Sequence, residues 1–87
     1  MNIQALDERV LIKQNPPEKT SFGGFKIPES SVFRPNKGVV ISVGKNVKEI
    51  KEGDTVLFDG SFGLVMEKDG DLFRVLEKRN IFAVENK

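Results

Sequence analysis

Short apolar runs recur along the chain, most of them bounded by glycine, proline, asparagine or aspartate. Runs of this length that are rich in valine, isoleucine and phenylalanine are typical of β-strands. Asp69–Gly70 separates two of the runs and is a strong signal for a tight hairpin turn. No stretch repeats apolar residues at helical spacing over enough length for a long helix. The pattern predicts strands at residues 10–12, 39–43, 55–58, 64–68, 71–76 and 81–84, one helical turn at 77–80, and an all-β fold, either a small barrel or a sandwich.

One long segment, residues 14–36, interrupts this pattern and shows no convincing strand or helix. It contains all four prolines of the chain and the pair Gly23–Gly24. Loops of this length are uncommon in compact domains and usually serve a function. The segment also carries five large apolar side chains, at positions 22, 25, 27, 32 and 33. Val32 and Phe33 are expected to fold back onto the sheet, whereas Phe25 and Ile27 fit residues exposed for a partner.

The composition excludes most catalytic and metal-binding chemistry. The 87 residues include no histidine and no cysteine, so the usual general base, metal ligands and activated nucleophiles are missing. The net charge of +1 argues against a dedicated nucleic-acid binder, which normally carries a basic excess. No apolar stretch is long enough to cross a membrane, and residues 1–8 lack the features of a signal peptide. We therefore expect a cytoplasmic, non-enzymatic protein.

Six motifs follow one another along the chain: Leu6–Lys13, Gly23–Glu29, Lys37–Gly44, Val47–Phe58, Phe62–Gly63 and Asn80–Val84. Together they resemble the chaperonin-10 family, the GroES-type co-chaperonins that cap a chaperonin-60 ring. The resemblance covers almost the whole chain as one domain, residues 1–87. It implies an irregular GroES-like β-barrel with one long mobile loop, at about residues 15–36.

The sequence departs from the family pattern at several positions. Glu8 and Asn80 each stand where the family usually has aspartate, and Lys26 is the middle residue of a triplet that is usually apolar. The largest departure lies between Gly44 and Gly53. Family members usually form a roof hairpin there, whereas residues 45–52 are too few for two strands and a turn. The resemblance then implies a lid with a wider opening at its apex, a shortening also attributed to some virus-encoded members.

The resemblance implies a chaperonin-60 partner that binds the nucleotide, so that the chain itself needs no cofactor and encloses client proteins indirectly. In an extended loop alternate side chains point to opposite faces, so Phe25 and Ile27 would enter one apolar groove while Lys26 faces water. The implied partner-binding residues are Gly23, Gly24, Phe25, Lys26, Ile27 and Pro28.

The resemblance also implies a seven-membered ring. Residues 9–13 and 81–84 read as short edge strands, and unpaired edges favour pairing with another chain. In the family the two terminal strands pair head-to-tail between neighbours. The implied interface residues are Val10, Leu11, Ile12, Ile81, Phe82 and Val84, although about half of them are expected to fill the core instead.

Two other functions fit parts of the sequence. A small β-barrel with seven phenylalanines could bind single-stranded nucleic acid by base stacking, but the near-neutral charge and the aspartates at positions 54, 59, 69 and 71 oppose this. A swinging-arm carrier domain would place its lysine at a hairpin tip, whereas Asp69–Gly70 occupies the tip here. Aspartates at such a turn are explained by the turn itself and not by a calcium site.

Overall fold

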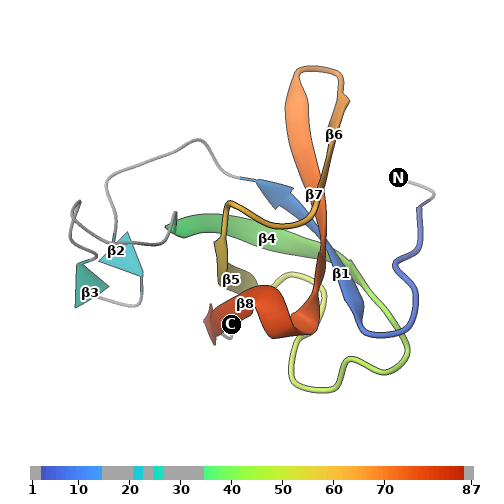
Figure 1. Ribbon diagram of the computed structural model, residues 1–87, viewed down its shortest axis with the longest axis horizontal. Coiled ribbons are helices and arrows are strands. Elements are labelled where there is room, and N and C mark those ends of the chain that lie inside the picture. Colours follow the sequence, from blue (N-terminus) through green and yellow to red (C-terminus); the bar gives the residue numbers. More distant parts are fainter. Residues whose placement is uncertain (1–2, 15–20, 23–24, 27–34, 86–87) are drawn as a thin grey trace.

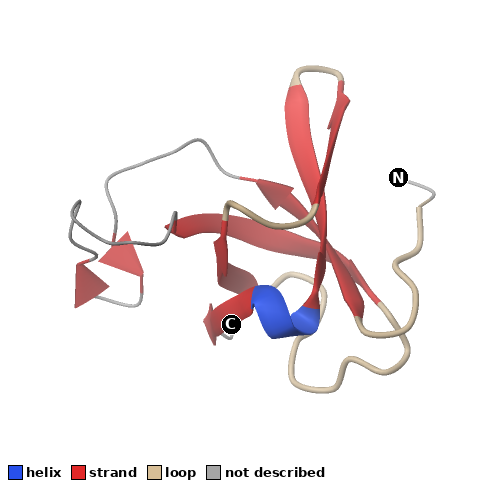
Figure 2. Cartoon of the chain, viewed as in Figure 1, coloured by secondary structure: helices blue, strands red, loops and turns tan. Residues whose placement is uncertain are grey.

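Strands dominate the part of the chain that the computed structural model describes, which is residues 3–14, 21–22, 25–26 and 35–85 (Figures 1 and 2). All six strands predicted from the apolar runs are present, and the single helical turn is a short 3-10 helix. The all-β prediction is therefore confirmed. The elements are β1 (Arg9–Gln14), β2 (Ser21–Phe22), β3 (Phe25–Lys26), β4 (Pro35–Val43), β5 (Thr55–Asp59), β6 (Leu64–Lys68), β7 (Asp71–Glu77), η1 (Lys78–Asn80) and β8 (Ile81–Glu85).

Six of the strands form one antiparallel sheet in the order β6-β7-β1-β4-β5-β8. The register brings the C-terminal end of β1, the start of β4 and the C-terminal end of β5 to the same end of the sheet, because Gln14 pairs with Gly38 and Pro35 with Asp59. The segment 15–34 leaves the sheet and returns to it at this end. The connection between β4 and β5 lies at the opposite end (Figure 1).

The main core lies on one face of this sheet. Strands from opposite sides of the sheet order contribute to it: Leu76 from β7 is buried in the cluster, and Ile81 and Val84 from β8 pack against it. Since both sides reach the same cluster, the sheet curls around it as a small irregular barrel. The buried members are Val10, Ile12, Val40, Val47, Ile50, Val56, Phe58 and Leu76.

Strand β1 lies inside the sheet, between β4 and β7. The prediction that residues 9–13 form an edge strand is therefore wrong. Val10 and Ile12 belong to the main core, while Leu11 points to the other face and packs with Ala5 and Phe73 in a second cluster. A strand covered on both faces carries a continuous apolar run without polar alternation, and residues 10–12 have this pattern.

The β6–β7 hairpin projects from the rest of the sheet (Figure 1). Its turn residues Asp69 and Gly70 both have positive φ angles, 53° and 85°. Two positive φ angles define the tight turn whose twist matches that of paired strands, and aspartate followed by glycine is a preferred sequence for it. The hairpin predicted at this dipeptide is confirmed.

The connection between β4 and β5, residues 44–54, contains turns but no strand. Val47 and Ile50 fold into the main core, with 8% and 4% of their surface exposed. The buried Asp54 closes the connection, because its carboxylate accepts a hydrogen bond of 3.0 Å from the backbone N–H of Lys51. The expectation that this stretch is too short for a hairpin is confirmed: it covers one end of the core instead.

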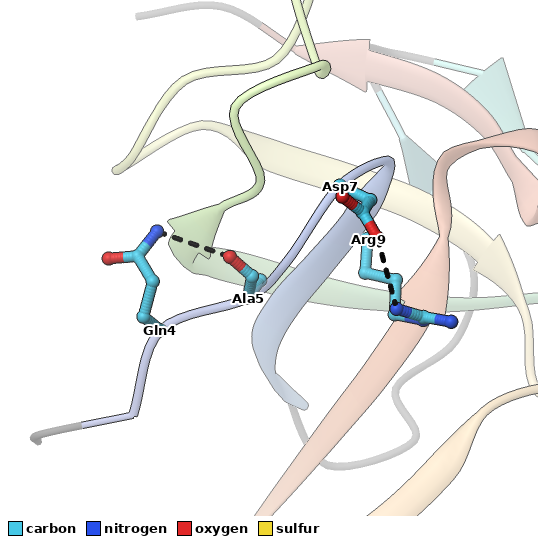
Figure 3. Close-up of polar contacts among 4 residues, drawn as sticks. All are labelled: Gln4, Ala5, Asp7 and Arg9. Carbon is cyan, nitrogen blue, oxygen red and sulfur yellow. Dashed lines mark hydrogen bonds and ion pairs between the residues drawn. The ribbon is translucent and has the colours of Figure 1, made fainter.

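Ala5, near the N-terminus, is buried in the second cluster, and Figure 3 shows it with the neighbouring residues Gln4, Asp7 and Arg9. The backbone N–H of Ala5 donates to the hydroxyl of Ser42 at 3.2 Å, and the Gln4 amide donates to the carbonyl of Val43 at 3.0 Å. Both contacts hold the segment against β4. The ion pair between Arg9 and Asp7, at 4.0 Å, lies in solvent on the turn that follows and contributes little to stability.

Gly44 is required where this N-terminal turn crosses the end of β4. A Cβ atom at Gly44 would collide with the carbonyl group of Asp7 and lie 2.7 Å from the carbonyl carbon of Leu6. Gly44→Ala is therefore expected to lower the free energy of unfolding by about 1–3 kcal/mol, the usual cost of overpacking. Urea denaturation followed by far-UV circular dichroism measures this change. Lys45→Ala, at an exposed neighbour, is the control, and an equal loss in both variants would contradict the explanation.

Candidate partner-binding site

The segment 15–34 carries the residues predicted to contact a partner, and the structure describes the two residues that flank it, Gln14 and Pro35. The chain leaves the sheet after Gln14 and re-enters it at Pro35. Gly23, Gly24, Ile27 and Pro28 lie outside the described residues, as do Val32 and Phe33, so the roles assigned to them stay predictions. Phe25 and Lys26 form β3, whose extended backbone suits the alternation that the prediction requires.

Two short strands within this segment correct the prediction that it contains none. Ser21–Phe22 and Phe25–Lys26 pair in antiparallel register, Ser21 opposite Lys26 and Phe22 opposite Phe25. The intervening Gly23–Gly24 is a dipeptide favoured in two-residue hairpin turns. The signal was therefore present in the sequence, as two phenylalanines flanking a glycine pair, but each strand is too short to stand out as an apolar run.

Strand β4 also begins earlier than predicted, at Pro35 instead of Val39, which shortens the predicted loop of residues 15–36 at its C-terminal end. Asn36, Lys37 and Gly38 pair with Phe58, Leu57 and Val56 of β5. Pairing with an apolar strand therefore extends β4 through residues with little strand preference of their own. Proline is tolerated at the first position of a strand, so Pro35 is compatible with this start.

Arg74 is the main polar residue at this end of the sheet, and the sequence analysis missed it. It lies on β7 opposite Ile12 and two residues from Leu76, on the face that carries the main core. Only 8% of its surface is exposed. One sequence signal could have identified Arg74. It occupies an inward position of its strand, next to apolar inward residues, and a buried charged residue requires partners.

The guanidinium of Arg74 makes four hydrogen bonds. Its Nε and Nη2 donate to the side-chain oxygen of Gln14 at 3.2 and 3.1 Å. Its Nη1 donates to the backbone carbonyls of Gly60 and Phe62 at 3.1 and 2.6 Å. The group also lies over the ring of Phe58, 5.5 Å from its centroid, a favourable cation–π position. Arg74 thus joins the last residue of β1 to the β5–β6 connection.

Burial lowers the pKa of Arg74 from its ordinary value, and the negative charge of Asp59 partly opposes this shift. Desolvation disfavours the charged form of any base, while a nearby carboxylate favours it. Asp59 is itself buried, and its carboxylate accepts a hydrogen bond of 2.9 Å from the N–H of Ser61. Arginine stays protonated at all physiological pH values, so the site holds a permanent positive charge.

Strand β8, the other predicted interface element, forms the outer strand of the sheet next to β5. A bulge opposite Leu57 and Phe58 inserts one extra residue into β8. Because of the bulge, Ile81 and Val84 both pack against the main core, although strict alternation would place them on opposite faces. Phe82 faces outward and is 49% exposed.

The predicted subunit interface therefore divides into two parts. Val10, Leu11 and Ile12 have no exposed surface in the protomer and fill the two cores. Their role between protomers stays a prediction. Ile81, Phe82 and Val84 lie on an outer strand of the described sheet, and their role between protomers stays a prediction.

The described residues contain no group of three or more histidine, cysteine, aspartate or glutamate side chains placed to hold a metal ion. Within the same residues no helix is long and apolar enough to cross a membrane. The buried aspartates 54 and 59, counted earlier against nucleic-acid binding, are hydrogen-bonded in turns. Asp54 thus holds a turn at the far end of the sheet, and Asp59 holds a turn next to Arg74.

These features define a class: a small antiparallel β-protein that holds a long segment by both ends at one end of its sheet. The chain belongs to the chaperonin 10 kDa subunit family, whose model matches residues 2–85. It is 35% identical to the co-chaperonin GroES of Parabacteroides distasonis, over 97% of this chain and 99% of that protein. It is 36% identical to that of Bacteroides fragilis, over 97% and 98%, and 34% identical to that of Thermodesulfovibrio yellowstonii, over the full length of both.

The family and its relatives confirm the resemblance drawn from the six motifs. The protein is a co-chaperonin. Binding of single-stranded nucleic acid, the alternative left open by the sequence, is not favoured by any of these matches.

Proposed function

We propose that this co-chaperonin is a ring-shaped lid that binds a nucleotide-loaded chaperonin-60 ring through Gly23–Pro28 and encloses client protein beneath it. Membership of the chaperonin 10 kDa family carries this proposal. The structure supports it through the position of Gln14 and Pro35, which present the segment 15–34 from one end of the sheet, away from the covered end formed by residues 44–54.

A single segment would bind its partner weakly. Burial of Phe25 and Ile27 gains about 1.5–3 kcal/mol for each side chain. Ordering the backbone costs roughly 1–2 kcal/mol per residue, so about six newly ordered residues cancel that gain. The affinity of one segment then lies near the millimolar range. Several segments on one rigid ring bind together far more tightly, because each later contact is intramolecular.

Membership of the same family supports the proposed assembly into a seven-membered ring, which would supply this multivalency. A chain of 87 residues buries only about 60–65% of its unfolded surface and gains stability from association. The outer strand β8, with Phe82 exposed, is the element proposed to meet the next protomer. A contact between two different surfaces that closes on itself gives cyclic symmetry.

Nucleotide is assigned to the partner and not to this chain. The sequence contains no glycine-rich phosphate-binding loop followed by lysine and serine or threonine. The proposed lid therefore needs no cofactor of its own and responds to ATP only through the state of the chaperonin-60 ring. The cytoplasm is the proposed location, consistent with the absence of cysteine from the sequence.

Co-sedimentation with a chaperonin-60 ring, with and without ATP, tests the proposed function. We expect the protein to sediment with the ring only when nucleotide is present. Native mass spectrometry of the free protein is expected to show a species near seven times 9.7 kDa. A monomer that ignores the ring under both conditions and retards single-stranded DNA would overturn the proposal and favour the nucleic-acid alternative.

A further inference from the structure

Both ends of the segment 15–34 rest on the site of Arg74. The Gln14 side chain, at the start of the segment, accepts two hydrogen bonds from the guanidinium. Pro35, at its end, pairs with Asp59, whose charge attracts the same guanidinium. Arg74 therefore contacts one end directly, and near the other it donates to the carbonyl of Gly60, the residue after Asp59. We call these residues, Gln14, Asp59 and Arg74, the stem clamp.

The geometry fixes the guanidinium from several sides. Nε and Nη2 donate hydrogen bonds to the single side-chain oxygen of Gln14. Nη1 donates to the carbonyls of Gly60 and Phe62. The ring of Phe58 lies beneath the group. Every buried side-chain nitrogen and oxygen of the described residues has a partner. An apolar side chain at this inward position would avoid the cost of burying a charge, so stability alone is a poor reason for an arginine here.

We propose that Arg74 is a positioning residue that clamps the base of the partner-binding segment and thereby sets how strongly the segment binds chaperonin-60. The proposal rests on the proposed function. A segment whose ends are fixed loses less conformational freedom on binding than one whose ends can fray. In a ring, the loss of affinity at each segment adds to the losses at the other segments, so the affinity of the whole ring falls more than that of a single segment.

Replacement of Gln14 tests the clamp with little disturbance of the core. Gln14→Met removes the acceptor, and we expect about tenfold weaker binding to a nucleotide-loaded chaperonin-60 ring, measured by titration calorimetry. Amide exchange at residues 13 and 14 of the free protein is expected to accelerate. Gln14→Glu offers a charged acceptor and a stronger hydrogen bond, so binding is expected to equal or exceed that of the wild type.

Arg74→Leu is the second variant and Arg79→Leu its matched control. Arg79 lies on η1, with its side chain 80% exposed, so its replacement makes the same change in charge without touching the clamp. Arg74→Leu is expected to weaken binding as Gln14→Met does while the melting temperature stays within a few degrees of the wild type, because leucine fills the inward position. Arg79→Leu is expected to bind like the wild type.

The outcomes separate this proposal from the proposed function. Equal affinities for the wild type, Gln14→Met and Arg79→Leu would overturn the clamp and leave the proposed function intact. A wild-type protein that fails to bind the ring would overturn the proposed function together with the predicted loss of affinity. Unchanged amide exchange at residues 13 and 14 in Gln14→Met would overturn the clamp even without any partner.

Discussion

Replacement of Ile27 by aspartate is expected to reduce capture by a nucleotide-loaded chaperonin-60 ring by at least about 100-fold, to below detection in co-sedimentation. An unpaired carboxylate in an apolar groove costs several kcal/mol, and every 1.4 kcal/mol is a tenfold change in affinity. The substitution occurs in every protomer of a ring, so the loss is multiplied across the segments that must bind together. Titration calorimetry and co-sedimentation with ATP measure the effect.

Two companion variants make this result specific. Ile27→Val keeps an apolar, branched side chain and is expected to retain most of the binding. Lys26→Asp adds negative charge at the position predicted to face water, and we expect a much smaller loss than for Ile27→Asp. Native mass spectrometry should show the same oligomeric state for all three variants as for the wild type. Capture of Ile27→Asp at wild-type strength would show that the anchor residues are assigned incorrectly.

Removal of the Phe58 ring is expected to have the largest effect on stability. Phe58 has no exposed surface and lies in the main core beneath the guanidinium of Arg74. Loss of a buried phenylalanine side chain costs about 3–5 kcal/mol through lost burial and the cavity left behind. A domain of this size is stable by only about 4–13 kcal/mol, so Phe58→Ala removes much of the total and leaves Arg74 without the ring.

Far-UV circular dichroism in urea is the suitable measurement, because the chain has no tryptophan or tyrosine to report by fluorescence. Phe62→Ala is the matched control: its ring is half exposed, and its carbonyl, which accepts from Arg74, is kept. We expect Phe62→Ala to change the free energy of unfolding by less than about 0.5 kcal/mol, as surface substitutions usually do. A comparable loss in both variants would contradict the assignment of Phe58 to the centre of the core.

The sequence was sufficient for the strands whose apolar runs stand alone. It predicted the hairpin at Asp69–Gly70 because two adjacent residues contain the whole turn signal. It failed where the structure depends on distant partners. No residue near Pro35 indicates that pairing with β5 extends β4 as far as this position. Likewise, the sequence of β1 does not indicate that β7 pairs with it on the side opposite β4.

The candidate site shows the same division. The motif at residues 23–28 could be proposed from the sequence alone, because the family resemblance lies in consecutive residues, and its role stays a prediction. The stem clamp could not, since Gln14, Asp59 and Arg74 are far apart in sequence and meet only when the sheet forms. The bulge that turns both Ile81 and Val84 inward is likewise set by the pairing of β8 with β5. Side chains that meet across a sheet need the register, which short strands alone do not specify.

The connection at residues 44–54 has a consequence for engineering. Val47 and Ile50 anchor it in the core, while Lys48 and Glu49 between them are exposed. A peptide grafted between Lys48 and Glu49 would keep both anchors, and surface loops tolerate such insertions at a small entropic cost. In the proposed lid, grafts of graded length at this connection would change the volume available to an enclosed client. They would leave the opposite end of the sheet, next to Gln14 and Pro35, unchanged.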